Sequence, residues 1–249
     1  MIKIEHINKT FNKGKANEVV ALSDVSLRIA QGEYVVVVGA NGSGKTTLLN
    51  TIAGAILSDS GKVLFDDVDM TTVAEHKRSS YIARVFQNPL SGTAPDLTIL
   101  DNFRLAALRT STKKLTIGIN ENFKQKVKEH IAELGMGLEN KIDQPIGSLS
   151  GGQRQALTLL MSVMDEAKIL LLDEPTAALD PKSAKIVLQT ADRIIKQYHL
   201  TAILITHTLK DAYDYGNRII QMGEGKILKD LTASEKNKLE LKDLFEWFA

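Results

Sequence analysis

A glycine-rich loop between an apolar segment and a helical segment is the feature that most restricts the fold of this chain. Residues Tyr34 to Val38 are continuously apolar, as in a strand buried on both faces. The loop Gly39-Ala-Asn-Gly-Ser-Gly-Lys-Thr46 follows, and a helical segment from Thr46 to Ala53 then ends at Gly54. Such glycines let backbone N–H groups converge on phosphate oxygens at the positive end of a helix. The sequence therefore predicts a phosphate-binding loop in an α/β fold.

Three further apolar runs indicate buried strands: Tyr81 to Phe86, Ile169 to Leu172, and Ala202 to Ile205. Helical patterns lie between the runs, at Gln153 to Met164 and at Ser183 to Tyr198. Strands that alternate with helices predict a parallel sheet.

Two regions depart from this alternation. Residues 1 to 33 alternate like antiparallel strands, and the stretch from about Leu97 to Leu149 is rich in helical patterns. At 249 residues, the chain is within the range of one domain with an additional lobe. We expect the helical stretch to form that lobe.

Polar residues follow each of the four predicted buried strands. The glycine loop follows the first, and the other three are followed by Gln87, by Asp173 with Glu174, and by Thr206 with His207. Ligands of open parallel sheets bind beyond the carboxyl ends of the strands, so we expect these groups to converge on one nucleotide.

Each of these groups has a chemistry that suits phosphate transfer. Lys45 would reach the terminal phosphates, and Thr46 and Asp173 would hold Mg²⁺. Glu174 could polarise a water molecule aimed at the terminal phosphorus, and His207 could orient that water or contact the phosphate. A single Gln or His after a strand is more often structural, so the prediction depends on the four strand ends together.

A second anion-binding surface is predicted at Ser148-Leu-Ser-Gly-Gly-Gln153, which precedes an apolar helix. Ser150 is a natural N-cap, and two glycines expose backbone N–H groups at the positive helix end. Because the first loop already binds the nucleotide of its own chain, this surface needs another nucleotide or the nucleotide of another chain. The second option implies a head-to-tail homodimer with two ATP molecules between its subunits.

These motifs resemble the ATP-binding subunits of ABC transporters over nearly the whole chain. The most specific part is Leu149-Ser-Gly-Gly-Gln153, placed some twenty residues before Ile169-Leu-Leu-Leu-Asp-Glu174, with the glycine loop far upstream. The resemblance implies one ABC-ATPase domain over residues 1–249. Within it, a nucleotide-binding core with an antiparallel β subdomain would span about 1–87 and 165–249, and a helical subdomain about 88–164.

The resemblance also assigns roles to individual residues. Gln87 becomes a sensor glutamine that contacts the metal and the reacting phosphate, Glu174 the catalytic base, and His207 the switch histidine. Asp180 would act across the dimer, and Phe11 would stack on adenine, although without the family Phe11 is more typical of a core residue. The residues expected to contact ATP are Phe11, Gly39, Asn41, Gly42, Ser43, Gly44, Lys45, Thr46, Thr47, Ser150, Gly151, Gly152, Gln153 and Asp180.

Composition limits the other classes of function. Lys and Arg number 31 against 30 Asp and Glu, without a basic cluster, so nucleic acid is not an expected partner. The absence of cysteine excludes disulfides and thiolate chemistry. The first residues, Met1-Ile-Lys-Ile-Glu-His-Ile-Asn-Lys, lack the apolar block expected of a signal peptide, and no run approaches the roughly 20 apolar residues of a membrane span.

A chain of this family without its own membrane span would need a separate permease. We therefore expect an ATPase that powers solute transport from the cytoplasmic face of the cell membrane. Asn88-Pro-Leu-Ser-Gly-Thr-Ala-Pro-Asp-Leu-Thr98 resembles a subgroup of bacterial importers that use a substrate-binding protein, some of them predicted to carry aromatic amino acids. Nothing in the sequence selects the cargo.

Two alternatives of other classes remain open: an ABC-type ATPase of cell division or iron–sulfur assembly, and a nucleotide-binding scaffold without turnover. The presence of Lys45, Asp173, Glu174 and His207 favours turnover. Two segments also have open roles. Arg109 to Lys128 is polar and typical of a solvated helix and loop, with membrane contact as its alternative, and the aromatic tail Ala233 to Ala249 suits core packing or a partner-binding helix.

Overall fold

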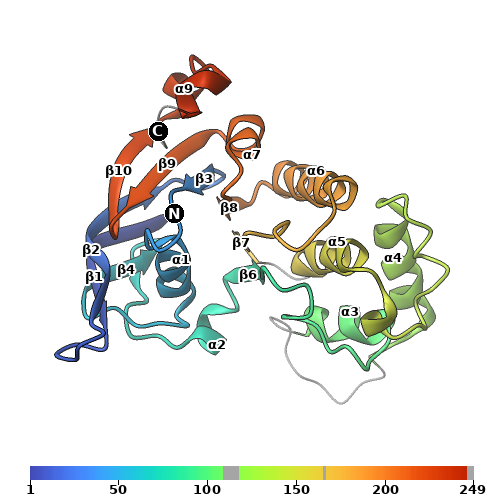
Figure 1. Cartoon of the computed structure of the whole chain (residues 1–249). Helices are drawn as coiled ribbons and strands as arrows, with labels where there is room; N and C mark the ends of the chain where they lie inside the picture. Colours follow the sequence, from blue (N-terminus) through green and yellow to red (C-terminus); the bar gives the residue numbers. More distant parts are fainter. Residues whose placement is uncertain (109–117, 165–166, 246–249) are drawn as a thin grey trace. The chain divides into compact units, whose positions relative to one another are not determined.

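The computed structural model describes residues 1–108, 118–164 and 167–245, and tertiary contacts divide the chain into two units. The first unit combines Met1–Ile82 with Leu200–Ala249, and the second comprises Ala83–His199. Figure 1 shows the elements of both units. The subdomain boundaries expected from the sequence stay a prediction.

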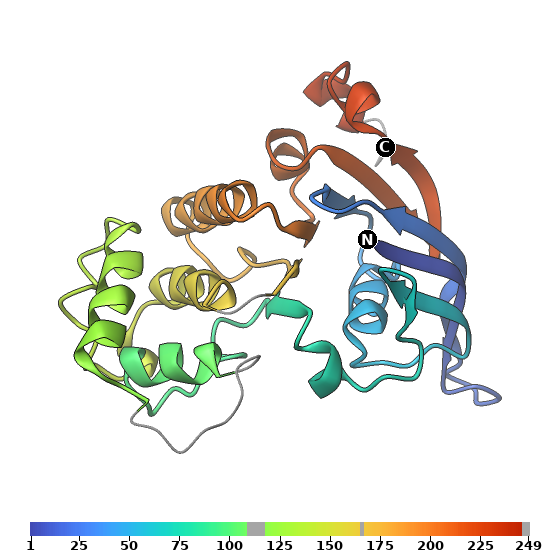
Figure 2. The same ribbon diagram turned by 180° about the vertical axis from the view of Figure 1, so that it is seen from behind.

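The N-terminal part forms a four-stranded antiparallel sheet in the order β2-β1-β4-β5, as its alternating sequence predicts. Its strands are β1 (Ile2–Phe11), β2 (Val19–Ile29), β4 (Ser60–Phe65) and β5 (Val68–Asp69). Ile2, Ile4 and Ile7 are buried and supply its apolar side. Figures 1 and 2 show helix α1 (Lys45–Ala53) alongside this sheet.

A second group of strands in the first unit has the order β10-β9-β3-β8. Its members are β3 (Tyr34–Val38), β8 (Thr201–Ile205), β9 (Arg218–Gly223) and β10 (Lys226–Leu231). Strand β3 is parallel to both β8 and β9. Every residue of β3 and β8 is buried, which explains why these strands are continuously apolar. The predicted parallel strands at Tyr34–Val38 and Ala202–Ile205 are confirmed.

Helix α1 ends where the sequence predicts, at Gly54, which has a φ of 81° in the left-handed region. The other helices of this unit are short: α2 (Glu75–Arg78), α7 (Leu209–Asp214), α8 (Ala233–Lys236) and α9 (Leu241–Phe245). Helix α9 packs against α7, and Leu244 of α9 is buried. Phe245 is 58% exposed, and Trp247 and Phe248 lie outside the described residues. Packing of the tail on its own unit is thus confirmed for Leu244.

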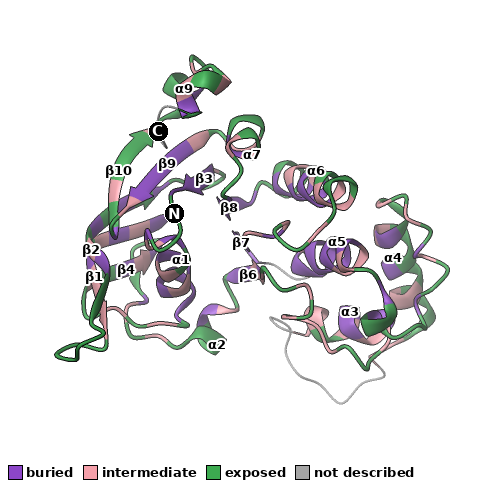
Figure 3. Ribbon diagram, viewed as in Figure 1, coloured by how far each residue is buried: buried purple, intermediate pink, exposed green. Residues whose placement is uncertain are grey.

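The described residues of the second unit form strands and helices. These are β6 (Ile82–Val85), α3 (Ile99–Ala107), α4 (Glu121–Ala132), the 3₁₀ turn η1 (Ile146–Ser148), α5 (Gly151–Ser162), β7 (Ile169–Asp173) and α6 (Pro181–Gln197). Strands β6 and β7 are neighbours, and α5 packs against α3, α4 and α6. Figure 3 shows α5 largely buried, in keeping with its apolar sequence.

The helix-rich stretch from Leu97 to Leu149 is confirmed in its described part, which holds α3, α4 and η1. Residues 109–117 of the polar segment Arg109 to Lys128 lie outside the described residues, whereas its end belongs to α4. Among residues 1–108, 118–164 and 167–245, no helix has both the length and the apolar character that crossing a membrane requires.

Candidate nucleotide site

The glycine loop leaves β3 and enters α1 with a backbone that needs glycine at two close approaches. Gly39 has a φ of 153°, and a side chain there would come within 2.2 Å of the carbonyl oxygen of Met222 on β9. Gly44, with a φ of 100°, would similarly meet the carbonyl oxygen of Ala21 at 2.5 Å. The loop is therefore pressed against β2 and β9, and only glycine allows that packing.

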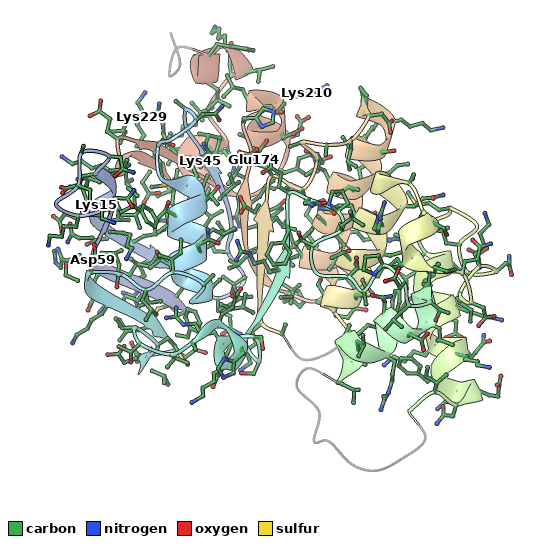
Figure 4. All side chains as sticks on the ribbon, turned by 60° about the horizontal axis from the view of Figure 1, so that its bottom comes forward. Lys15, Lys45, Asp59, Glu174, Lys210 and Lys229 are labelled. Atoms are coloured by element: carbon green, nitrogen blue, oxygen red, sulfur yellow. The ribbon has the colours of Figure 1, made fainter. Side chains whose placement is uncertain are left out.

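Lys45 lies over the loop rather than pointing away from it. It is 5% exposed, and its Nζ donates hydrogen bonds to the carbonyl oxygens of Gly39 at 2.9 Å and Ala40 at 3.0 Å. Figure 4 labels Lys45 at the start of α1. A buried ammonium at the positive end of a helix makes this loop strongly attractive to an anion, as the sequence predicts.

His207 follows β8 beside the loop. The register pairs Val37 of β3 with Ile205 of β8, and the backbone N–H of Thr206 donates to the carbonyl oxygen of Val37 at 3.2 Å. The parallel register therefore carries Gly39 and His207 off the same edge of the sheet, and His207 is exposed there. Within the first unit, the predicted convergence of these two strand ends is confirmed.

A cavity of about 540 Å³ opens beside the first half of the loop. Ala40, Asn41, Gly42 and Ser43 line it from the loop, and the turn between β9 and β10 lines it from the other side. Asn41 and Gly42 are exposed, whereas Ser43 and Lys45 are buried, so the loop has an open and a packed side.

In the second unit, Gln87 and Glu174 follow neighbouring strands and contact each other. The Gln87 amide Nε2 lies 3.5 Å from Glu174 Oε2, at the long limit of a hydrogen bond. Glu174 has a φ of 44°, an uncommon conformation for a residue other than glycine, which turns the chain directly after β7. The predicted approach of these two strand ends is confirmed within this unit.

Asp173 is the last residue of β7, and it is 7% exposed. Its Oδ2 lies 3.5 Å from Nη2 of Arg84 on β6. Mg²⁺ prefers oxygen ligands and usually combines one or two carboxylates with phosphate oxygens and water. No group of three or more His, Cys, Asp or Glu that could hold a metal occurs among the described residues. The buried Asp173 carboxylate is a ligand of the kind that Mg²⁺ prefers.

The second predicted anion surface has the expected cap. Ser150 is the N-cap of α5: its hydroxyl accepts from the backbone N–H of Gln153 at 3.3 Å, and Gln153 Oε1 accepts from the backbone N–H of Ser150 at 3.1 Å. Ser150 itself is exposed. A side chain at Gly152 would meet Ser183 Cβ at 2.5 Å, so this glycine also permits close packing of α5 on α6.

Two further predicted residues, Asp180 and Phe11, lie at the ends of other elements. Asp180 is the N-cap of α6, where it accepts from the backbone N–H groups of Lys182 and Ser183, and hydrogen bonding from Ser183 lowers its pKa. Phe11 ends β1 and is half-buried, with Lys9 Nζ 5.7 Å from the centre of its ring. Phe11 is thus not a fully buried core residue.

Three polar residues of these strand ends and helices were not selected from the sequence. Arg84 interrupts the apolar run of β6, Gln155 is a 1% exposed amide in an apolar helix, and Asp211 lies in the first turn of α7 near His207. Burial and the charge of Asp214 raise the pKa of Asp211, while the charge of His207 opposes the shift. A charged or amide residue inside an otherwise apolar run was the signal for the first two.

The first unit carries a phosphate-binding loop with a buried lysine, and the second carries a carboxylate pair at the end of a buried strand. Both features are typical of nucleotide-binding ATPases of the P-loop class. Comparison with known proteins gives the family. The ABC transporter family model matches residues 22–177, more than half of the chain, and the chain belongs to this family as an ATP-binding subunit. It has the α/β fold of ABC ATPases and their ATPase function in powering solute transport.

Individual relatives cover almost the entire chain. The tyrosine transport ATP-binding protein of Clostridioides difficile (strain R20291) is 37% identical over 251 residues, which are 100% of this chain and 98% of the relative. The energy-coupling factor transporter ATP-binding protein EcfA2 of Clostridium tetani (strain Massachusetts / E88) is 31% identical, with coverage of 92% and 78%.

Solved structures agree with the sequence relatives. The dimeric structure of MJ0796, a bacterial ABC transporter cassette, has a TM-score of 0.80 at 27% identity and covers 94% of this chain and 99% of the other. A dimeric post-hydrolysis state of the same cassette, bound to ADP and Pi, has a TM-score of 0.79 at the same identity and coverage.

Proposed function

We propose that the two strand-end groups act on one ATP molecule. Residues Gly39 to Thr47 bind its phosphates, with Lys45 on the terminal ones, and Phe11 stacks on adenine. The contact between Gln87 and Glu174 carries this proposal, because it joins a metal-sensing amide to a carboxylate directly after the buried Asp173. Thr46, Gln87 and Asp173 supply the oxygen ligands for Mg²⁺, which neutralises charge on the phosphates.

Glu174 is proposed as the general base that activates water, and His207 as the group that orients the water or the terminal phosphate. The positive φ of Glu174 supports this role, because uncommon backbone conformations of this kind cluster at functional sites. Lys45 stabilises the negative charge that develops on the transferred phosphate.

The active form is proposed to be a head-to-tail homodimer. In it, Ser150, Gly151, Gly152 and Gln153 of one subunit bind the nucleotide held by the glycine loop of the other, and Asp180 acts across the same interface. The exposed N-cap of α5 and the dimeric relatives support this arrangement. ATP then favours the closed dimer, and hydrolysis releases it.

The partners are proposed to be the integral membrane subunits of an importer and, through them, an extracytoplasmic substrate-binding protein. The chain would associate peripherally with the cytoplasmic face of the cell membrane. The full-length match to a tyrosine transport protein makes an amino acid, and tyrosine first, the proposed cargo.

The dimer proposal has a direct test in the Glu174→Gln background, where we expect ATP turnover to be strongly reduced. We expect ATP with Mg²⁺ to convert the protein from monomer to dimer in size-exclusion chromatography with light scattering. Ser150→Asp keeps an N-cap but adds a negative charge, so it should abolish the dimer, whereas the neutral cap Ser150→Asn should retain it. A Ser150→Asp protein that still dimerises would exclude a partner phosphate at this position.

The transport proposal is tested by affinity purification of the Glu174→Gln protein with ATP from detergent-solubilised cells of the source organism. A co-purifying multi-span membrane protein supports the proposal, and the binding protein that works with it can then be titrated with tyrosine. Reproducible recovery of soluble partners alone would instead support a non-transport ATPase.

A further inference from the structure

Arg84 is a cationic side chain in a strand that is otherwise buried. Its neighbours Ile82, Ala83 and Val85 are all buried, and the Arg84 side chain itself is 12% exposed. A guanidinium at this depth needs compensating partners, since desolvation of an unpaired charge is strongly unfavourable. The partners of Arg84 therefore indicate what it does.

The guanidinium contacts Asp173 and Phe86. Its Nη2 forms the ion pair with Asp173 Oδ2 at 3.5 Å, and the Asp173 side chain is only 11% exposed. Its central carbon lies 4.6 Å from the centre of the Phe86 ring, two residues further along the chain. Arg84 is thus held between an aromatic face and the carboxylate expected to bind the metal.

Phe86 is in turn held from helix α5. The Gln155 amide Nε2 donates to the carbonyl oxygen of Phe86 at 2.7 Å, and Gln155 is 1% exposed. A side chain added at Gly92 would meet the Phe86 ring at 3.4 Å, so that residue also lies against the ring. The position of Arg84 is therefore supported from both its own strand and α5.

A positive charge beside Asp173 has two opposing effects on a divalent cation. The guanidinium orients the Asp173 carboxylate. It also occupies part of the oxygen surface of that carboxylate and repels the divalent cation. In a mostly buried pair, the repulsion is weakly screened by salt. The geometry therefore favours competition between the guanidinium and the metal.

We propose that Arg84 is a positioning residue that holds the Asp173 carboxylate and competes with Mg²⁺ for it, so that Arg84 sets the Mg²⁺ concentration at which ATP binds. This inference rests on the proposed role of Asp173 in the ATP site. It adds Arg84 of β6 to that site and states the direction of its effect, which is to lower the affinity of the site for Mg²⁺.

The test is a Mg²⁺ titration of nucleotide binding, without any measurement of turnover. Full-length Glu174→Gln protein is mixed with a fluorescent ATP analogue, and anisotropy is followed as MgCl₂ is added. We expect Arg84→Met to lower the half-maximal Mg²⁺ concentration about tenfold. A neighbouring opposite charge typically shifts the pKa of a carboxyl group by about one unit, and one unit is a tenfold change in an equilibrium constant. Arg84→Lys keeps the charge and should stay within about threefold of the parent.

Arg104→Met is the matched control, because Arg104 lies 5.5 Å from the Phe123 ring on the helices of the same unit. It removes an arginine from an aromatic face away from Asp173, so we expect no shift. Melting curves of all variants report folding, and Arg84→Gln replaces Arg84→Met should the latter lose its cooperative melt.

Each outcome decides between the possible roles. The proposal is supported if the Mg²⁺ midpoint falls in the neutral Arg84 variants but not in Arg84→Lys or Arg104→Met. An unchanged or higher midpoint in these variants, with Mg²⁺-dependent binding intact in the parent, overturns it and leaves the proposed function standing. A parent that binds the analogue without any dependence on Mg²⁺ overturns the metal role of Asp173 and this inference together.

Discussion

Replacing Arg78 by Met is predicted to destabilise the helix that carries the phosphate loop. Arg78 is 1% exposed, and burial lowers its pKa. Its guanidinium donates to the carbonyl oxygens of Thr51 and Ile52 at 2.8 Å each, near the C-terminal end of α1. It also donates to the carbonyl oxygens of Val73 at 2.7 Å and Thr71 at 3.2 Å. A cation at this helix end satisfies carbonyl groups that the helix itself leaves unpaired.

The magnitude follows from these contacts. The carbonyl oxygen of Thr51 keeps the backbone N–H of Gly54 at 3.2 Å, whereas those of Ile52, Val73 and Thr71 lose the guanidinium donor. At about 1 kcal/mol net for each of the carbonyl groups of Ile52, Val73 and Thr71, the free energy of unfolding falls by about 3 kcal/mol. Methionine has a similar length and adapts to gaps, so the cavity contribution is small.

The assay is thermal and urea unfolding of the full chain. A loss of this size corresponds to a Tm lower by about 6–12 °C for a protein of this length. Arg78→Lys, which keeps the charge but not the planar donor geometry, should be intermediate. Lys77→Met changes an exposed neighbour on α2 and should shift stability by less than about 0.5 kcal/mol. If Arg78→Met unfolds within 1 kcal/mol of the parent, roughly the worth of one bond, the capping argument is wrong.

Three further predictions concern other parts of the chain. Glu174→Gln should lower ATP turnover at least about 100-fold while ATP affinity changes little, and Glu240→Gln, an exposed control, should leave both unchanged. Gly152→Ala should destabilise the protein by about 1–3 kcal/mol through its clash with Ser183, and added Ser183→Gly should recover part of the loss in a double-mutant cycle. Burial lowers the pKa of Lys236 from 10.5 to about 8, so between those pH values the unfolded chain holds a proton that the folded chain has lost. Stability relative to Lys236→Met should therefore rise with pH across this window, by up to about 1.4 kcal/mol per unit, and a constant difference would contradict the shift.

Patterns within short segments predicted most of the elements. The apolar runs at Tyr34–Val38 and Ala202–Ile205 are parallel strands, and the alternating N-terminus is an antiparallel sheet. Ser150 caps α5 and Gly54 ends α1, as their residue types indicate. These features depend on local backbone preferences and on burial of one strand or helix, which the sequence itself encodes.

Contacts between residues that are distant in the sequence could not be predicted from such local patterns. Arg84 reaches Asp173 across 89 positions of the chain, and Gln155 reaches the Phe86 carbonyl across 69. Lys236 donates to the carbonyl oxygens of Tyr215 and Gly216, which ties α8 to the end of α7. No spacing rule connects such residues, because their distances depend on how strands and helices pack.

The amino-acid sequence by itself determined the phosphate loop, the strand-end residues Gln87, Asp173, Glu174 and His207, and the family, since each follows from residue types at fixed local spacing. The tertiary structure decided which charges these residues meet. Only packing brought the Arg84 guanidinium to Asp173 and placed Arg78 on the end of α1, because a buried charge is compensated by whatever groups the folded chain brings within a few ångströms.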